Sequence, residues 1–228
     1  QSLVREAERR ELDILYGHTV YEALGAKGKP HLTGVDIRRI VGKGEVADKT
    51  RPIECDLLCM SAGYMPAYSL LCQAGGRLSY DDTRAEFSLT HLPPHLHIAG
   101  SVNGIHTLDA VIADGKRAAF QALNNLDLSQ VTPETPHCAR KLNFQWPLFK
   151  HPKGKEFVDF DEDLQIKDIV NATRMGYRDV QLVKRFSTVG MGPSQGRHSA
   201  LPTARLVAKA TDRTVTETGV TTARPPYA

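Results

Sequence analysis

Strand-like patterns dominate the first half of the chain, and helix-like patterns dominate the second half. Residues 12–21 are rich in β-forming residues and residues 32–40 alternate apolar and polar positions, so each segment predicts a strand. Residues 55–63 and 96–100 are short apolar runs that end in small residues. That pattern is typical of parallel strands buried on both faces. A polar hairpin is expected between these two runs, which favours an α/β arrangement.

The periodicity changes after residue 100, where a helix is predicted over residues 108–123. Its apolar face carries Leu108, Val111, Ile112, Gly115 and Ala119. A strand, a glycine-bearing turn and a helix together present free N–H groups to an anion, so this turn is a candidate nucleotide site. The alternative is a plain turn without a ligand. The candidate binding residues are Gly100, Ser101, Asn103, Gly104 and Thr107.

A proline-bearing segment separates the two halves of the chain. Residues 127–156 lack periodicity and are expected to form a linker. Residues 157–212 predict a compact domain of three short helices, and residues 213–228 form a polar tail that ends in prolines. The predicted organisation is therefore the C-terminal part of an α/β domain over 1–126, a linker, a small all-α domain and a second linker.

Composition excludes several classes of protein. The 228 residues carry 29 Lys and Arg against 26 Asp and Glu, a net charge of +3, which predicts no nucleic-acid partner. No apolar run has the length of a membrane span, and four cysteines are too few for a disulfide scaffold. A reducing, cytoplasmic location is expected. The chain begins with Gln1, and we expect it to be a fragment of a longer polypeptide.

A second candidate site lies in the helical half. Adjacent cations are followed by hydroxyl and amide donors and by glycines that permit close backbone approach, which is the chemistry of a phosphate-bearing ligand. Solvated helix charges beside a simple turn are the alternative. The candidate residues are Lys184, Arg185, Ser187, Thr188, Ser194 and Gln195.

The sequences CDLLCMSAGYMPA and LHIAGSVNG, with a hairpin between them and a helix after them, resemble the C-terminal half of a two-dinucleotide-binding flavoprotein reductase. In that family an Asp that contacts the flavin follows the second strand. Ser101 stands at this position here, so the resemblance leaves both FAD and NAD open as ligands. The first glycine fingerprint of the family is absent from this sequence.

Residues 157–199 resemble a small helical iron–sulfur domain of the bacterioferritin-associated-ferredoxin type. Its four cysteine positions correspond to Asp159, Asp161, Ser194 and Ser199. Ferredoxin-type clusters need thiolate ligands, and carboxylates and hydroxyls are hard ligands, so no iron–sulfur cluster is expected.

The segments FVDFDEDLQIKDI, LVKRFSTVGMGPSQGR and TGVTTARPPYA resemble the α subunit of heterotetrameric sarcosine oxidases. The resemblance implies oxidative demethylation of sarcosine to glycine on a β subunit that carries FAD, with smaller subunits also present. It further implies FMN at a subunit interface, NAD or FAD in the dinucleotide domain, and tetrahydrofolate on a following aminomethyltransferase-like domain.

Two other interpretations stay open. The chain is alternatively part of an N-methylglutamate dehydrogenase or opine oxidase complex, or a cofactor-free docking subunit. No triad or dyad of nucleophile and base stands out in the sequence, so no catalytic residue is assigned to this chain. No metal ligands are assigned either.

Overall fold

The computed structural model describes residues 2–26, 28, 31–61, 65–131, 133–134, 136, 148–222 and 224–227. The chain divides into two compact units. The first unit combines Gln1–Ala62 with Asn143–Gly154, and the second combines Gly63–Leu142 with Lys155–Ala228. The two units reflect contacts within the folded chain, so they do not test the predicted domain boundaries, which remain predictions.

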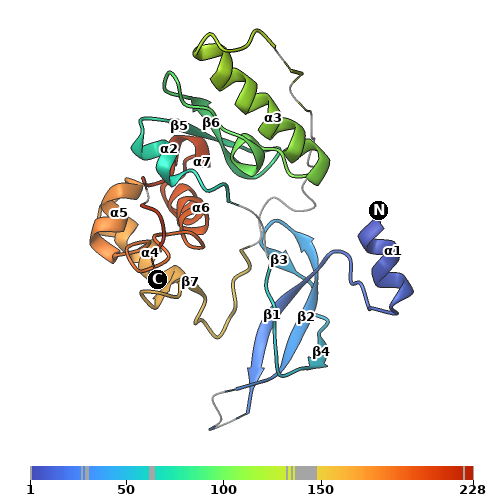
Figure 1. The fold of residues 1–228 in the computed structure, drawn as a ribbon. Coiled ribbons are helices and arrows are strands. Elements are labelled where there is room, and N and C mark those ends of the chain that lie inside the picture. The colour runs from blue at the N-terminus through green and yellow to red at the C-terminus, as the bar shows by residue number, and fades with distance from the viewer. Residues whose placement is uncertain are drawn as a thin grey trace. The chain divides into compact units, whose positions relative to one another are not determined.

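The first unit is a small antiparallel sheet preceded by one helix (Figure 1). Its central strand, β2, pairs with β1 along one edge and with β4 along the other. A Cβ on Gly34 would lie 2.7 Å from the Ile53 carbonyl oxygen, so a glycine is needed where β4 approaches β2. The elements are α1 (Ser2–Arg9), β1 (His18–Gly25), β2 (Leu32–Gly42), β3 (Glu45–Val46) and β4 (Arg51–Glu54).

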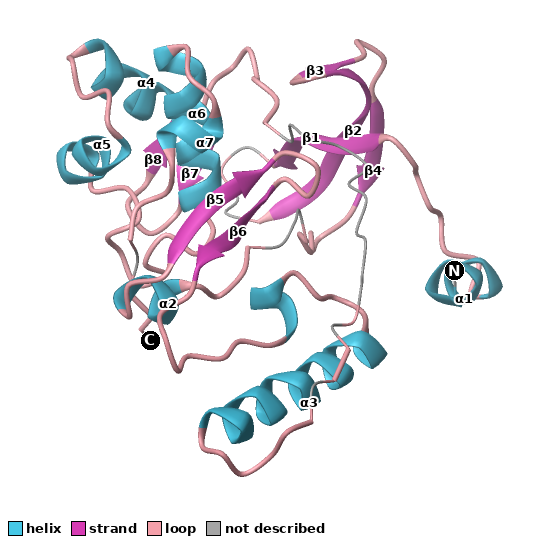
Figure 2. Cartoon of the chain, turned by 90° about the horizontal axis from the view of Figure 1, so that it is seen from above, coloured by secondary structure: helices cyan, strands magenta, loops and turns pink. Residues whose placement is uncertain are grey.

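In the second unit, the hairpin of β5 and β6 lies between α3 on one side and α6 with α7 on the other (Figures 1 and 2). The first elements are α2 (Ser69–Gln73), β5 (Arg77–Asp81), β6 (Glu86–His91), the 3₁₀ turn η1 (Gly100–Asn103) and α3 (Leu108–Asn125). The later elements are β7 (Phe157–Asp159), β8 (Leu164–Gln165), α4 (Ile166–Arg174), α5 (Val180–Ser187), α6 (Ala200–Thr211) and α7 (Val215–Thr218).

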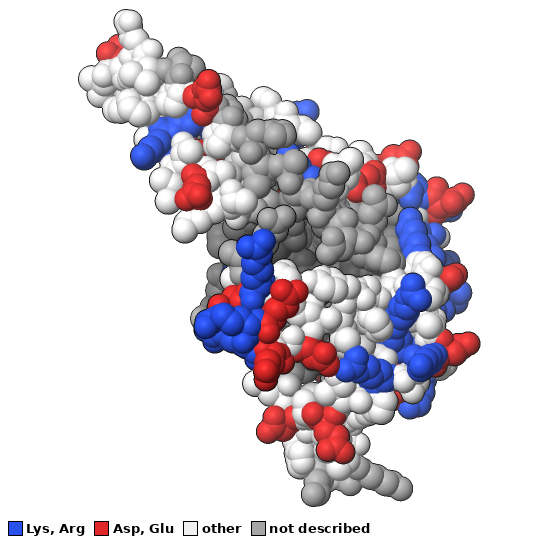
Figure 3. Space-filling model, turned by 90° about the vertical axis from the view of Figure 1, so that its right-hand side faces the viewer, with Lys and Arg blue, Asp and Glu red and all other residues white. Residues whose placement is uncertain are grey.

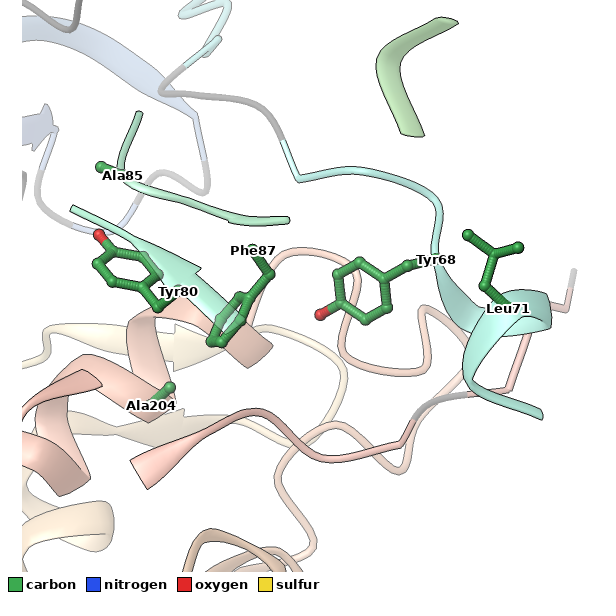
Figure 4. Close-up of a cluster of buried hydrophobic side chains, with 6 residues drawn as sticks. All are labelled: Tyr68, Leu71, Tyr80, Ala85, Phe87 and Ala204. Carbon is green, nitrogen blue, oxygen red and sulfur yellow. The ribbon is translucent and has the colours of Figure 1, made fainter. Parts of the chain in front are cut away.

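Aromatic packing joins the hairpin to the helical part of this unit. Phe87 is 1% exposed, and its ring meets the rings of Tyr80 and Tyr68 edge-on at centroid separations of 5.3 and 6.4 Å (Figure 4). Ala204 on α6 belongs to the same buried cluster, and the neighbouring Arg205 donates from Nη2 to the Tyr80 hydroxyl at 2.9 Å. The hairpin and α6 therefore share one core, which fixes the position of the helices that follow α3.

The two runs predicted as buried parallel strands are not strands in the described residues, so this prediction is wrong. Residues 55–61 leave the sheet after β4, and Leu57 and Met60 are more than 70% exposed. Residues 96–99 are also irregular, and the Ile98 carbonyl accepts from the Arg117 guanidinium rather than from a strand. A strand needs a hydrogen-bonded neighbour, and among the described residues of the two runs only the Cys55 N–H reaches a strand, donating to the Thr33 carbonyl of β2 at 3.4 Å.

The other patterns are largely confirmed. β2 covers the strand predicted at 32–40, whereas the strand predicted at 12–21 begins later, at His18. The hairpin forms as predicted, and α3 matches the helix predicted over 108–123. The three helices of the small domain are α4, α5 and α6. The fold is therefore α/β with a small helical part at its end, as the sequence predicts.

The surface agrees with the even balance of acidic and basic residues in the sequence. On the face drawn in Figure 3, acidic and basic side chains lie interspersed rather than in a single-sign patch. Among the described helices, none combines the length and the apolar character that crossing a membrane requires.

Gly104 has a φ of +75°, and a Cβ there would also collide with the Arg84 guanidinium. We expect Gly104→Ala to lower the free energy of unfolding by about 1–2 kcal/mol, since the left-handed conformation strains an L-residue. Gly115→Ala is the control, because nothing lies within 4 Å of its Cβ position and alanine favours a helix. Urea unfolding of both variants tests this, and equal stability of Gly104→Ala and the unchanged chain would contradict it.

Candidate functional site

A buried carboxylate organises the start of the small helical domain. β7 ends at Asp159, which is fully buried. Its Oδ1 accepts hydrogen bonds from the backbone N–H groups of Asp161 and Glu162, at 2.9 and 3.3 Å. These bonds close the turn between β7 and β8, as Asp side chains commonly do.

The second oxygen of Asp159 reaches the loop between α5 and α6. Oδ2 accepts from the Gly190 N–H at 2.7 Å and from the Ser199 hydroxyl at 2.9 Å. One side chain therefore joins the β7 turn, the glycine-rich loop and the start of α6. Four donors compensate the burial of its charge, which would otherwise be costly.

A second carboxylate closes the same contact from the other side. Asp161 Oδ2 accepts from the Ser194 N–H at 2.9 Å. The Ser194 side chain and its backbone N–H hold the pKa of Asp161 below its ordinary value. A Cβ on Gly192 would collide with the Asp161 side chain, so the glycine makes this close approach possible.

The structure thus brings together all four positions that the sequence aligned with cluster cysteines. They meet as two pairs, Asp159 with Ser199 and Asp161 with Ser194. The atoms that these side chains could offer to a metal are carboxylate and hydroxyl oxygens, which do not suit an iron–sulfur cluster. The structure explains how the two turns stay together through hydrogen bonds instead.

His198 adds a third potential metal ligand beside the two carboxylates. Ligand atoms of Asp159, Asp161 and His198 lie within 4.8 Å of one another. However, both oxygens of Asp159 already accept hydrogen bonds, and His198 Nε2 lies 3.3 Å from the Phe160 N–H, which donates to it. A cation would have to displace these donors. The absence of a resident metal stays a prediction.

The predicted cations lie at a cavity next to this contact. Lys184 and Arg185, in the last turn of α5, line a cavity of about 560 Å³ together with Gln195. The Gln195 side chain is held across its loop, because Nε2 donates to the carbonyls of Met191 and Gly192 at 2.9 and 3.0 Å. The remaining lining residues are Gln181, Met191, Thr222, Arg224 and Tyr227.

The cavity is electropositive. No Asp or Glu lines it, and within the described part of the chain Lys184, Arg185 and Arg224 form no ion pair. Burial, and then the charge of Arg224, lower the pKa of Lys184 below its ordinary value. The arrangement favours an anion, which would relieve the repulsion among these cations.

The other three candidates form hydrogen bonds within the chain and do not line the cavity. The Ser187 hydroxyl donates to the Val183 carbonyl at 2.7 Å, and the Thr188 hydroxyl reaches Glu162 Oε2 at 2.9 Å. Ser194 donates to Asp161 through its backbone N–H, as described above. Of the six candidates, therefore, Lys184, Arg185 and Gln195 line the cavity. Arg224 was missed, because a residue of the tail carries no local signal that it returns to this loop.

The candidate nucleotide turn is built around a different buried carboxylate. Asp114 on α3 accepts from the Gly100 N–H at 2.8 Å, from the Asn103 amide at 3.2 Å and from Arg117 Nε at 2.6 Å. Gly100 and Asn103 therefore donate inward. Ser101 and Thr107 are exposed, and the Thr107 side chain makes no capping bond to α3.

Comparison with known proteins identifies the relatives of this chain. The family model described as the sarcosine oxidase A3 domain matches residues 153–228, which contain both the Asp159 contact and the electropositive cavity. A sarcosine oxidase subunit alpha from Rhizobium meliloti (strain 1021) is 31% identical over 211 residues, or 89% of this chain. This chain is therefore similar to sarcosine oxidase α subunits over most of its length, and its last third matches the A3 domain.

Other relatives extend this result. A sarcosine oxidase subunit alpha from Corynebacterium sp. (strain P-1) is 25% identical over 97% of this chain. The chain spans 20% of the Rhizobium subunit and 24% of the Corynebacterium subunit. A hydrogen cyanide synthase subunit HcnB from Pseudomonas protegens is 25% identical over 65% of this chain and 36% of its own length.

A solved structure shares the fold. The L-proline dehydrogenase from P. horikoshii superposes with a TM-score of 0.68 over 98% of this chain and 45% of its own, at 20% sequence identity. At that identity the match supports the fold assignment alone. Because the match covers 98% of the chain, it includes residues of both compact units.

Replacing Asp159 by Ala tests the buried contact. The change leaves the Gly190 N–H and the Ser199 hydroxyl without an acceptor, so we expect a loss of about 3 kcal/mol or more in the free energy of unfolding. The control Asp163→Asn changes an exposed carboxylate of the same turn and should alter stability by less than about 0.5 kcal/mol. Similar urea midpoints for the two variants would contradict the role given to Asp159.

Proposed function

We propose that this chain is part of the α subunit of a heterotetrameric sarcosine oxidase. The complex would demethylate sarcosine oxidatively to glycine, with tetrahydrofolate as methylene acceptor. The match of residues 153–228 to the A3 domain and the relatedness to named α subunits support this proposal. The chain would act in the cytoplasm beside a β subunit that carries FAD and smaller subunits.

The role proposed for the helical domain is to bind the phosphate of FMN at a subunit interface. The observation that carries it is the cavity lined by Lys184 and Arg185, two cations without an ion-pair partner among the described residues. A phosphate monoester carries nearly two negative charges at neutral pH and accepts several charge-assisted hydrogen bonds. When bound, FMN would supply electron transfer between the amine-oxidising flavin and the final acceptor.

This chain would contribute binding rather than bond-breaking chemistry. The polar groups around Asp159 and Asp114 are engaged in internal hydrogen bonds, and the Ser199 hydroxyl beside Asp159 is fully buried, so neither cluster presents a nucleophile to a substrate. Amine oxidation is assigned to the β subunit.

The turn at residues 100–107 is the proposed site for NAD or FAD. Ser101 and Thr107 are the exposed members of the predicted set, and the first N–H groups of α3 follow them. Gly100 and Asn103 would hold the shape of the turn through Asp114. No iron–sulfur cluster is proposed for the helical domain, because the four aligned positions offer oxygen ligands.

The test is flavin retention by the full chain with its partner subunits. The double variant Lys184→Ala/Arg185→Ala should bind FMN at least about tenfold more weakly, a loss of ~1.4 kcal/mol, because two charge-assisted contacts disappear. Riboflavin has the same ring system without the phosphate, so its binding should change little. Flavin fluorescence quenching measures both affinities, and flavin released on denaturation identifies the natural occupant.

Arg174→Ala is the control, because it removes an exposed arginine from the last turn of α4 and leaves the cavity intact. Unchanged FMN affinity in the double variant would contradict the proposed site. Release of no FMN from the intact assembly would favour a cofactor-free docking subunit instead.

A further inference from the structure

The C-terminal tail folds back onto the glycine-rich loop. Thr218 at the end of α7 and Thr221 after it are buried, and the Tyr227 N–H donates to the Pro193 carbonyl at 3.0 Å. Thr222, Arg224 and Tyr227 then line the same cavity as the cations of α5. The tail therefore forms one wall of this cavity, although it lies about forty residues after α5 in the sequence.

Arg224 occupies a central place in that wall. It lines the cavity of about 560 Å³ and also a smaller neighbouring one of about 100 Å³, and Gln195 likewise borders both. Residues of the smaller cavity include Tyr68, Ala200 and Pro226. Arg224 thus lies between a polar cavity and a more apolar one, next to the loop that Gln195 bridges.

The charges on the two walls repel each other. Lys184 and Arg224 line the same cavity, and after burial the charge of Arg224 is the second cause that lowers the pKa of Lys184. Because no Asp or Glu lines the cavity among the described residues, no acidic side chain there offsets this repulsion. An anion with two charges placed between the walls would convert the repulsion into attraction on both sides.

We propose that Arg224 is the third ligand of a phosphate monoester held by Lys184 and Arg185, and that this anion fastens the tail to the helical domain. The inference rests on the proposed FMN site and adds to it a ligand from the tail. Arginine presents a planar fork that suits two phosphate oxygens, whereas a lysine offers a single charged point. Flavin occupancy and the order of residues 219–227 are then coupled, because each stabilises the other.

The experiment compares Arg224→Ala, Arg224→Lys and Arg213→Ala in the full chain with its partner subunits. Arg213 is the matched control, since it is an exposed arginine shortly before α7 that does not line the cavity. We expect Arg224→Ala to weaken FMN binding about tenfold and riboflavin binding less than twofold. Arg224→Lys should restore part of the affinity, and Arg213→Ala should match the unchanged chain.

Hydrogen exchange of the tail gives an independent readout. In the unchanged chain, adding FMN should slow exchange of the backbone amides in residues 219–227, including the Tyr227 amide that donates to Pro193. Riboflavin should not produce this protection, and Arg224→Ala should abolish it. Inorganic phosphate alone should protect the same amides at higher concentration, because the phosphate is the shared chemical group.

Two failures are distinguishable. If the unchanged chain binds FMN while Arg224→Ala binds it equally well and the tail stays unprotected, the role of Arg224 is overturned and the FMN site stands. If loss of Lys184 and Arg185 also leaves FMN binding unchanged, the proposed site itself is wrong, and the inference fails with it.

Discussion

The arrangement of the helical domain depends on one buried carboxylate. Asp159 is fully buried and accepts hydrogen bonds from the β7 turn, from Gly190 and from Ser199. An isolated carboxylate would pay a large desolvation cost at this position, so the surrounding donors have to be in place for the domain to fold as it does. The same bonds set the loop that carries Gln195 and, beyond it, the wall of the electropositive cavity. These internal hydrogen bonds therefore shape the cavity. Its positive charge comes from Lys184, Arg185 and Arg224, which take no part in those bonds.

Asp114 performs a similar structural task in the other part of the second unit. It accepts from the Gly100 N–H just as Asp159 accepts from the Gly190 N–H. In both places a glycine-bearing turn directs a backbone donor toward a buried aspartate. In the sequence such turns look like ligand-binding loops, but some of their backbone N–H groups are used in hydrogen bonds within the fold. The groups that remain for a ligand are the side chains at the rim, above all Lys184 and Arg185.

The sequence predicted what depends on local patterns and on a specific motif. The period of apolar positions identified α3 and α4, and the sequence also predicted α5 and α6. The family resemblance placed Asp159, Asp161, Ser194 and Ser199 at the four cysteine positions of a cluster, and the structure brings these positions into contact. The runs at 55–61 and 96–99 failed as strands, since an apolar run becomes a strand only beside a pairing partner. Arg224 was not predicted as a site residue either, because its position depends on a tertiary contact of the tail with Pro193.

A double-mutant cycle on Asp159 and Ser199 tests the central claim most directly. The stabilities of Asp159→Ala, Ser199→Ala and the double variant give the coupling energy between the two side chains. A hydrogen bond between a buried carboxylate and a hydroxyl at 2.9 Å predicts a coupling of about 1–3 kcal/mol. A coupling within about 0.3 kcal/mol of zero would contradict the role given to the hydrogen bond between Asp159 and Ser199 in holding the two turns together.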